Sequence, residues 1–84
     1  MTDDEKLTMA QDALKQVADV CQVGMFEMNG IDIGAAARRD ASDLLDANRA
    51  LSDLWLATQG GCTINGLNIG VLAMNTLSAI GGGS

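Results

Sequence analysis

The stretch that decides the fold is residues 64–80, which read INGLNIGVLAMNTLSAI. It belongs to a longer region without charge, because the last charged residue is Asp53 and 31 residues follow it. Apolar surface on this scale belongs in a core, against a partner or on a membrane. A chain of this size buries only about 60–65% of the surface that its unfolded form exposes. We therefore expect a second molecule to cover part of this stretch.

The spacing of the apolar residues predicts a helix over residues 64–80, capped by Thr63 or Asn65. The glycines at positions 66 and 70 cost about 1 kcal/mol each relative to alanine inside a helix. Close packing of two backbones on a Gly-x-x-x-Gly strip is the expected compensation. Self-association is therefore assigned to the small and bulky side chains of this helix: Gly66, Gly70, Ala73, Leu67, Val71, Met74 and Leu77.

A second long helix is predicted over residues 32–59, with Asp32 as its N-cap and Gly60-Gly61 at its end. Residues 31–33 also alternate like a short strand, but the alanines that follow favour a helix. The apolar seam of this helix has alternating spacings of three and four: Ala37, Ala41, Leu44, Asn48, Leu51, Trp55 and Thr58. Trp55 is accordingly expected in the core, with an interface anchor as its alternative role.

The opposite face of this second helix carries the charges. Arg39/Asp43 and Arg49/Asp53 stand four residues apart, so this face is interpreted as a solvated ladder of ion pairs. Asp40 falls nearer the apolar side; it is either a rim residue or a carboxylate offered to a partner's arginine. If the acidic face binds a partner, the residues that do so are Asp40, Asp43, Asp46 and Asp53.

The first helix is predicted over residues 3–28. Thr2 and Glu5 have the spacing of a capping box, and the apolar positions from Leu7 onward recur at three and four. Its end is expected at Gly24 or, at the latest, at Asn29-Gly30. The chain has no proline, which suits uninterrupted helices. The predicted architecture is all-α: a three-helix hairpin or bundle in one domain, 1–80, without internal repeats, followed by a flexible Gly-rich tail, 81–84, and packed as a homodimer.

The sequence lacks the usual means of catalysis. It has no His and no Tyr, which removes His-based triads, His metal ligands and a general base near neutral pH. In a three-helix bundle Cys21 and Cys62 would lie at opposite ends, so no disulfide between them is expected. We predict no catalytic residues, no metal site and no cofactor, and a protein that is not an enzyme.

The charge pattern constrains the partner. The net charge is −6 and the isoelectric point is about 4.1, which argues against direct binding of nucleic acid. It permits a protein partner with a basic surface. The N-terminus has neither the basic nor the apolar part of a signal peptide, so a cytoplasmic location is expected.

Three features of the sequence resemble a small helical-hairpin family of unknown function found in pseudomonads. They are Phe26 to Gly30, the run Ala41-Ser42-x-Leu44-Leu45, and the later glycine-linked helix. The resemblance covers about the last two-thirds of the chain. It implies helices and a bacterial setting, and it carries no functional residues.

The leading hypothesis for function is a small acidic protein-binding module of bacterial or phage origin. It would act as a stoichiometric inhibitor or adaptor by occupying a partner protein's surface. One alternative is a structural subunit that assembles only with itself. The other is a protein that lies on a membrane surface through its uncharged C-terminal helix. Because the longest unbroken apolar run is short and the polar face of the helix has Asn instead of Lys or Arg, membrane association is the weakest of the three.

Overall fold

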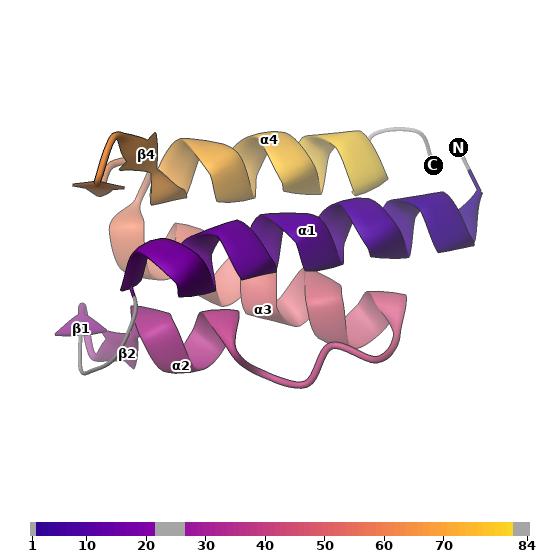
Figure 1. The fold of residues 1–84 in the computed structure, drawn as a ribbon, viewed down its shortest axis with the longest axis horizontal. Helices are drawn as coiled ribbons and strands as arrows, with labels where there is room; N and C mark the ends of the chain where they lie inside the picture. The colour runs from indigo at the N-terminus through magenta and orange to yellow at the C-terminus, as the bar shows by residue number, and fades with distance from the viewer. Residues whose placement is uncertain (1, 22–26, 82–84) are drawn as a thin grey trace.

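The computed structural model describes residues 2–21 and 27–81, and within these residues the chain forms four helices and two short hairpins (Figure 1). The helices are α1 (Asp3–Cys21), α2 (Ile33–Ala37), α3 (Leu44–Thr58) and α4 (Ile69–Gly81). The first hairpin pairs β1 (Glu27–Met28) with β2 (Ile31–Asp32), and the second pairs β3 (Thr63–Ile64) with β4 (Leu67–Asn68). The all-α prediction is confirmed at this level, since both two-stranded ladders are minor.

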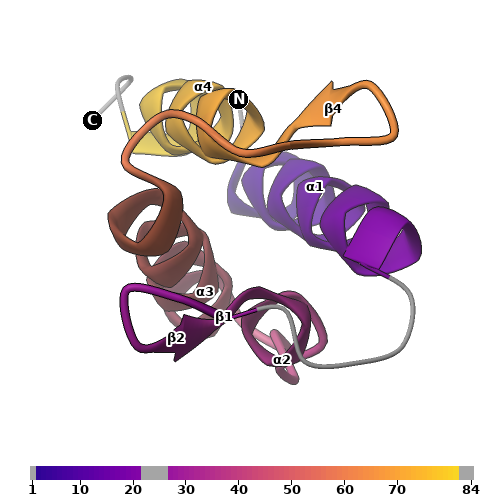
Figure 2. The ribbon, with the colours of Figure 1, turned by 90° about the vertical axis from the view of Figure 1, so that its left-hand side faces the viewer.

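The three long helices, α1, α3 and α4, run along the long axis of the molecule, and α2 lies beside the far end of α1 (Figure 1). The view along that axis shows the helices arranged around a common centre (Figure 2). Alanine supplies much of the core, which lets the helices approach closely. The buried hydrophobic residues are Ala10, Ala13, Leu14, Val17, Ile33, Ala36, Ala37, Ala47, Ala50, Leu51, Leu54, Ala57, Ile69, Ala73 and Ile80.

The predicted N-caps of the first two helices are confirmed. At the start of α1 the Thr2 amide donates to Glu5 at 2.9 Å and the Glu5 amide donates to the Thr2 hydroxyl at 3.1 Å. The Asp32 carboxylate accepts from the Ala35 amide at 3.0 Å at the start of α2. Each contact satisfies an amide that the first turn of a helix leaves without an internal partner.

The single helix predicted over residues 32–59 is wrong. It is divided into α2 and α3 by an α2–α3 linker, residues 38–43. The cause is local: Asp43 is itself an N-cap, and its carboxylate accepts from the Asp46 amide at 2.8 Å. An aspartate that bonds to the backbone in this way starts a new helix instead of continuing the previous one. The predicted seam is also displaced within α3, which buries Ala47, Ala50 and Ala57 rather than Asn48 and Trp55.

The helices predicted over residues 3–28 and 64–80 are also too long, because each runs into a hairpin. α1 ends at Cys21 and residues 27–28 are in β1; residues 22–26 lie outside the described part. α4 begins only at Ile69. In both hairpins an Asn-Gly pair has positive φ at both residues, 51° and 80° for the first and 51° and 82° for the second. These are the turn residues that match the twist of two paired strands.

The chain contains an internal repeat, which corrects the expectation that it has none. The hairpins and the helix starts that follow them align at an offset of 36 residues, MNGIDIGAAA with INGLNIGVLA. The preceding helices align at an offset of 37 residues, and their identical positions are Leu7/Leu44, Ala10/Ala47, Ala13/Ala50 and Leu14/Leu51. The second copy uses Asn68 as its helix cap, which accepts from the Val71 amide at 3.0 Å as Asp32 accepts from Ala35.

Each copy is a helix, a hairpin and a second helix: α1 to α2 in the first copy, α3 to α4 in the second. Contacts within a copy join α1 to α2 and α3 to α4, and contacts between copies join α1 to α3, α1 to α4 and α2 to α3. A single copy has too few elements to enclose a core, so the two copies complete one another. The copies differ in the length of their second helix: α2 ends at Ala37, whereas α4 continues to Gly81.

Candidate functional site

A groove with a volume of about 590 Å³ lies between α1 and α4. We call it the α1–α4 groove. Seven of its nine lining residues come from α1 and two from α4: Asp4, Glu5, Thr8, Met9, Asp12, Ala13, Gln16, Leu72 and Thr76. Because 12 residue steps separate Asp4 from Gln16, the groove follows α1 for about 18 Å.

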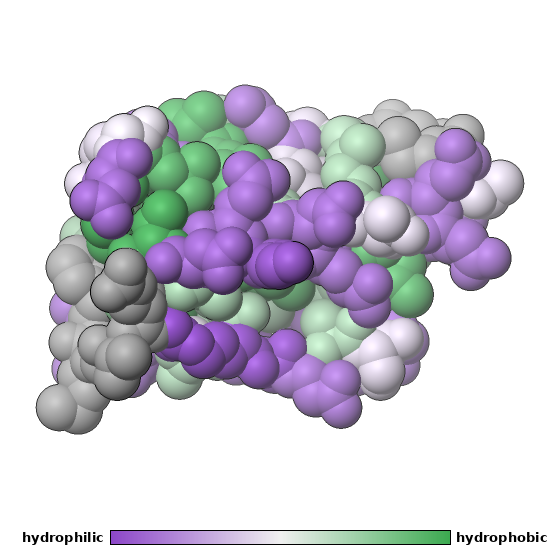
Figure 3. All heavy atoms as spheres, viewed as in Figure 1, coloured by the Kyte–Doolittle hydropathy of each residue, from purple (hydrophilic) through white to green (hydrophobic). Residues whose placement is uncertain are grey.

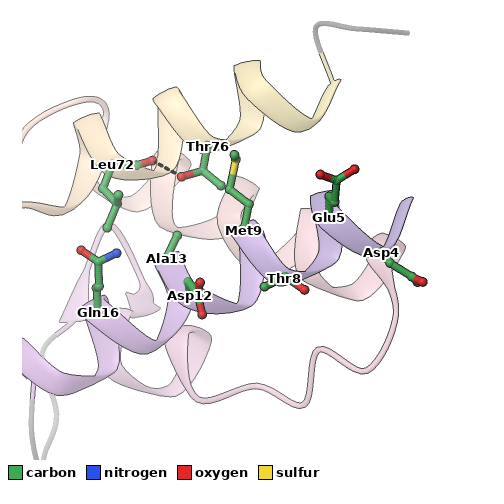
Figure 4. Close-up of a pocket in the computed structure, with 9 residues that line it drawn as sticks. All are labelled: Asp4, Glu5, Thr8, Met9, Asp12, Ala13, Gln16, Leu72 and Thr76. Carbon is green, nitrogen blue, oxygen red and sulfur yellow. Dashed lines mark hydrogen bonds between the residues drawn. The ribbon is translucent and has the colours of Figure 1, made fainter. Parts of the chain in front are cut away.

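The groove has an apolar floor and an acidic rim. Met9 and Ala13 extend from α1 toward α4, where Leu72 and Thr76 face them (Figure 4). Ala13 and Thr76 are buried and Met9 and Leu72 are half-buried, whereas Asp4, Thr8, Asp12 and Gln16 are exposed. In the space-filling view hydrophilic atoms run across the middle of this face, over α1, and hydrophobic atoms gather above them, toward β4 and the start of α4 (Figure 3).

The polar group of the floor is already satisfied, whereas the rim carboxylates of Asp4 and Asp12 have no side-chain hydrogen bond or ion pair among the described residues. The Thr76 hydroxyl donates to the Leu72 carbonyl at 2.7 Å, so it presents its methyl group rather than an unpaired donor. Glu5 is engaged with Thr2, whose backbone and side-chain hydrogen bonds lower the pKa of the Glu5 carboxyl. None of the lining residues is basic. The groove therefore presents an apolar surface edged with negative charge.

A second, smaller groove of about 250 Å³ occupies the corresponding place in the other copy. We call it the α3 groove; it is lined by Arg39, Leu45, Asn48, Arg49, Ser52 and Asp53. Leu45, Arg49 and Asp53 are the repeat counterparts of Thr8, Asp12 and Gln16. Here Arg39 of the α2–α3 linker reaches α3 and pairs with Asp53 at 2.8 Å.

The residues predicted to mediate self-association are divided between the core and the surface. Gly66 is not helical, because it is the second turn residue of the β3–β4 hairpin. Gly70 and Ala73 pack inside the chain: a Cβ on Gly70 would lie 2.6 Å from the Thr58 hydroxyl and from the Gly60 carbonyl carbon. The close approach predicted for the small residues is therefore made within one chain, and the predicted Gly-x-x-x-Gly helix strip is wrong. The bulky members remain accessible: Val71 is 37% and Met74 43% exposed, and Leu67 and Leu77 are half-buried.

The predicted acidic face is not one surface. Asp40 is exposed in the α2–α3 linker, Asp43 caps α3, Asp46 is half-buried in the first turn of α3, and Asp53 pairs with Arg39. The predicted ladder pairs Arg39/Asp43 and Arg49/Asp53 are absent among the described residues. The linker removes Arg39 from the helix that was to contain it, and Asp53 pairs with Arg39 instead of Arg49. The acidic rim of Asp4, Glu5 and Asp12 was not predicted, although Asp4, Thr8 and Asp12 recur every four residues along the predicted first helix.

Trp55 does not lie in the core, which corrects the expectation for its seam. It is 37% exposed, and two further large apolar side chains of α3 are more exposed, Leu45 at 60% and Leu56 at 52%. The alanines of α3 occupy the buried positions in their place. The alternative role of Trp55 as an interface anchor stays a prediction.

The two cysteines lie at the same end of the molecule, not at opposite ends. The extra return of the chain through α2 and its linker brings the end of α3 back to the end of α1 (Figure 1). Both thiols are free and half-buried. Burial raises the pKa of both thiols, and the nearby Cys62 contributes further to the raised pKa of Cys21.

In residues 2–21 and 27–81, no helix has the length and apolarity required to cross a bilayer. In comparisons with known proteins, no family model, curated protein or solved structure matches this chain. The resemblance to the pseudomonad helical-hairpin family stays a prediction.

Proposed function

We propose that this protein is a small, acidic, non-enzymatic protein-binding module, a stoichiometric inhibitor or adaptor that acts by engaging one partner protein. The observation that carries the proposal is the α1–α4 groove, with its apolar floor and carboxylate rim. An enclosed pocket buries most of a small ligand, but here five of the nine lining side chains are exposed. A groove that is open along one helix suits a segment of a protein.

Site-specific photo-crosslinking in the native cell tests this function. A photoreactive residue replaces Thr8 or Gln16 in the groove, and in a control it replaces Asp19, an exposed residue of α1 outside the groove. We expect one protein species, crosslinked in a 1:1 complex, from the two groove positions and not from position 19. If no such species forms, or if it forms equally from position 19, the proposal fails.

The exposed apolar side chains of α3 and α4 support a second proposal, that the protein also forms a homodimer. Val71 and Met74 lie on the side of α4 that α1 and α3 leave uncovered. Light scattering of the purified protein should give a dimer, and the V71K/M74K variant should give a monomer. S78K, at another exposed position of α4, is the matched control and should remain dimeric. An unmodified protein that is monomeric at every concentration would contradict the proposal.

A further inference from the structure

The α1–α4 groove has an internal counterpart, the α3 groove, in which the chain places its own arginine. In the α3 groove the Arg39 guanidinium pairs with the Asp53 carboxylate from a linker that bends away from α2. The repeat counterpart of Arg39 is Asn75, which lies within α4. Because α4 stays helical to Gly81, no linker of the second copy bends across α1 in the described part of the chain.

The open groove has the charge to receive the same kind of group from outside. Asp4, Glu5 and Asp12 contribute carboxylates to its rim, and Glu5 is the one already engaged in a cap. Asp12 is exposed, on the same stripe of α1 as Thr8 and Gln16. A cation that docks beside Asp12 gains a charge-assisted contact at the edge of an apolar surface, where such contacts direct orientation and specificity.

The walls of the groove indicate the conformation of the ligand. Both walls are helices, and neither offers the free edge of a strand on which an extended peptide could pair. A groove of about 18 Å accommodates about three turns of a third helix. The half-buried Met9 and Leu72 then provide the contacts for an apolar stripe at positions i, i+3, i+4 and i+7.

We propose that the α1–α4 groove binds a basic amphipathic helix of a partner protein, with apolar residues on the floor formed by Met9, Ala13 and Leu72 and an arginine or lysine beside Asp12. This inference rests on the proposed function and specifies the partner. The arginine or lysine of the partner helix pairs with Asp12 as Arg39 pairs with Asp53 in the α3 groove.

Three synthetic 15-residue peptides test the inference, all with one leucine stripe of helical period. The first has arginine beside the stripe, the second has glutamate at the same positions, and the third has arginine and a central proline that breaks the helix. Each is titrated into the full-length ¹⁵N-labelled protein. We expect saturable shifts at the amides of Thr8, Asp12 and Leu72 with the arginine peptide, and an affinity lower by about tenfold or more with the other two.

Two variants locate the charge contact. D12N should weaken binding of the arginine peptide by about threefold, as expected for a partly exposed ion pair, and added NaCl should weaken it further. D19N, which removes an equal charge from α1 outside the groove, should leave the affinity unchanged.

Equal binding of the glutamate peptide, or of the proline peptide, in this groove would overturn the basic-helix inference and leave the proposed function standing. Shifts confined to another surface would overturn the inference, and crosslinking at Thr8 and Gln16 would then decide the proposed function separately.

Discussion

Gly70 is a glycine at which an added Cβ would meet another chain segment within 4 Å. It is buried in the first turn of α4, against Thr58 and Gly60 at the end of α3. No side chain fits there without movement of the Gly60 backbone. A glycine that costs helix stability is therefore used where a helix must touch the end of its neighbour.

G70A should destabilise the protein by about 2 kcal/mol, because overpacking of about 1–3 kcal/mol exceeds the gain of about 1 kcal/mol in helix propensity. Urea unfolding measures the change. G81A is the matched control, since a Cβ at position 81 meets nothing within 4 Å. It should change the free energy of unfolding by less than about 0.5 kcal/mol. Equal effects of the two substitutions would contradict the close approach.

Cys21 and Cys62 should react slowly with iodoacetamide in the native protein, because burial raises the pKa of each thiol and lowers its thiolate fraction. Folding disfavours the charged form of both. The contribution of these thiols to stability is therefore present below the pKa of an unfolded cysteine and is lost as the pH rises through the folded value. Labelling in urea is the control, and it should be faster for both residues.

The C62S variant tests whether the two thiols are neighbours. Removing the Cys62 thiolate removes one of the causes that raise the pKa of Cys21, so Cys21 should become more reactive at alkaline pH. Peptide mapping after timed alkylation measures this rate. No change in the Cys21 rate would place the two residues too far apart to interact.

At the scale of the elements, the two hairpins have the same Asn-Gly turn but differ in the hydrogen bonds that the asparagine side chain makes. The Asn29 side chain donates to the Ala57 carbonyl at 2.7 Å, so the first hairpin satisfies the end of α3 in the other copy. Asn65 makes no side-chain hydrogen bond in the described part of the structure. The first hairpin is thus also a link between the two copies.

N29A should destabilise the protein by about 1 kcal/mol more than N65A, the typical net value of one hydrogen bond. Both variants lose an asparagine from a left-handed turn position, so their difference isolates the bond to Ala57. Urea unfolding of the two variants under one set of conditions gives this difference. If both variants lose the same free energy of unfolding, the Asn29–Ala57 hydrogen bond does not contribute to stability.

At the scale of the whole molecule, the two copies form one core. α1 packs on both helices of the second copy, and α3 packs on both helices of the first. The buried hydroxyls of Thr58 and Thr76 donate to carbonyls one turn earlier, and no buried side-chain polar atom lacks a partner in the described residues. The uncharged C-terminal stretch is thereby covered in part by its own chain: Leu54, Ile69 and Ala73 are buried, whereas Leu56, Val71 and Met74 remain exposed.

The two copies should therefore unfold together. Trp55, the only tryptophan, reports on α3 in the second copy, whereas far-UV circular dichroism reports on all helices. We expect the urea transitions of the two signals to coincide, as in two-state unfolding. Separate midpoints would show that the copies are independent units.

The sequence alone determined the features that depend on local chemistry. The apolar periodicity identified α1 and α4, Thr2 and Asp32 were recognised as caps, and the absence of proline was correctly associated with helices. The hairpins and the repeat were also present in the sequence, in the two Asn-Gly pairs and in the alanines at equivalent positions. The hairpins were not predicted because Asn29-Gly30 was interpreted as a helix end and Asn65-Gly66 was placed inside a helix.

Only the tertiary structure decided which side of each helix is buried and which segments meet. The apolar stripe predicted over residues 32–59 is interrupted where Asp43 starts a new helix, and packing of α3 buries Ala50, Leu54 and Ala57 while Trp55 is 37% exposed. The α1–α4 groove depends on how α4 packs beside α1, which no local pattern encodes. The physical reason is that caps and turns are satisfied within a few residues, whereas burial is a property of the whole packed chain.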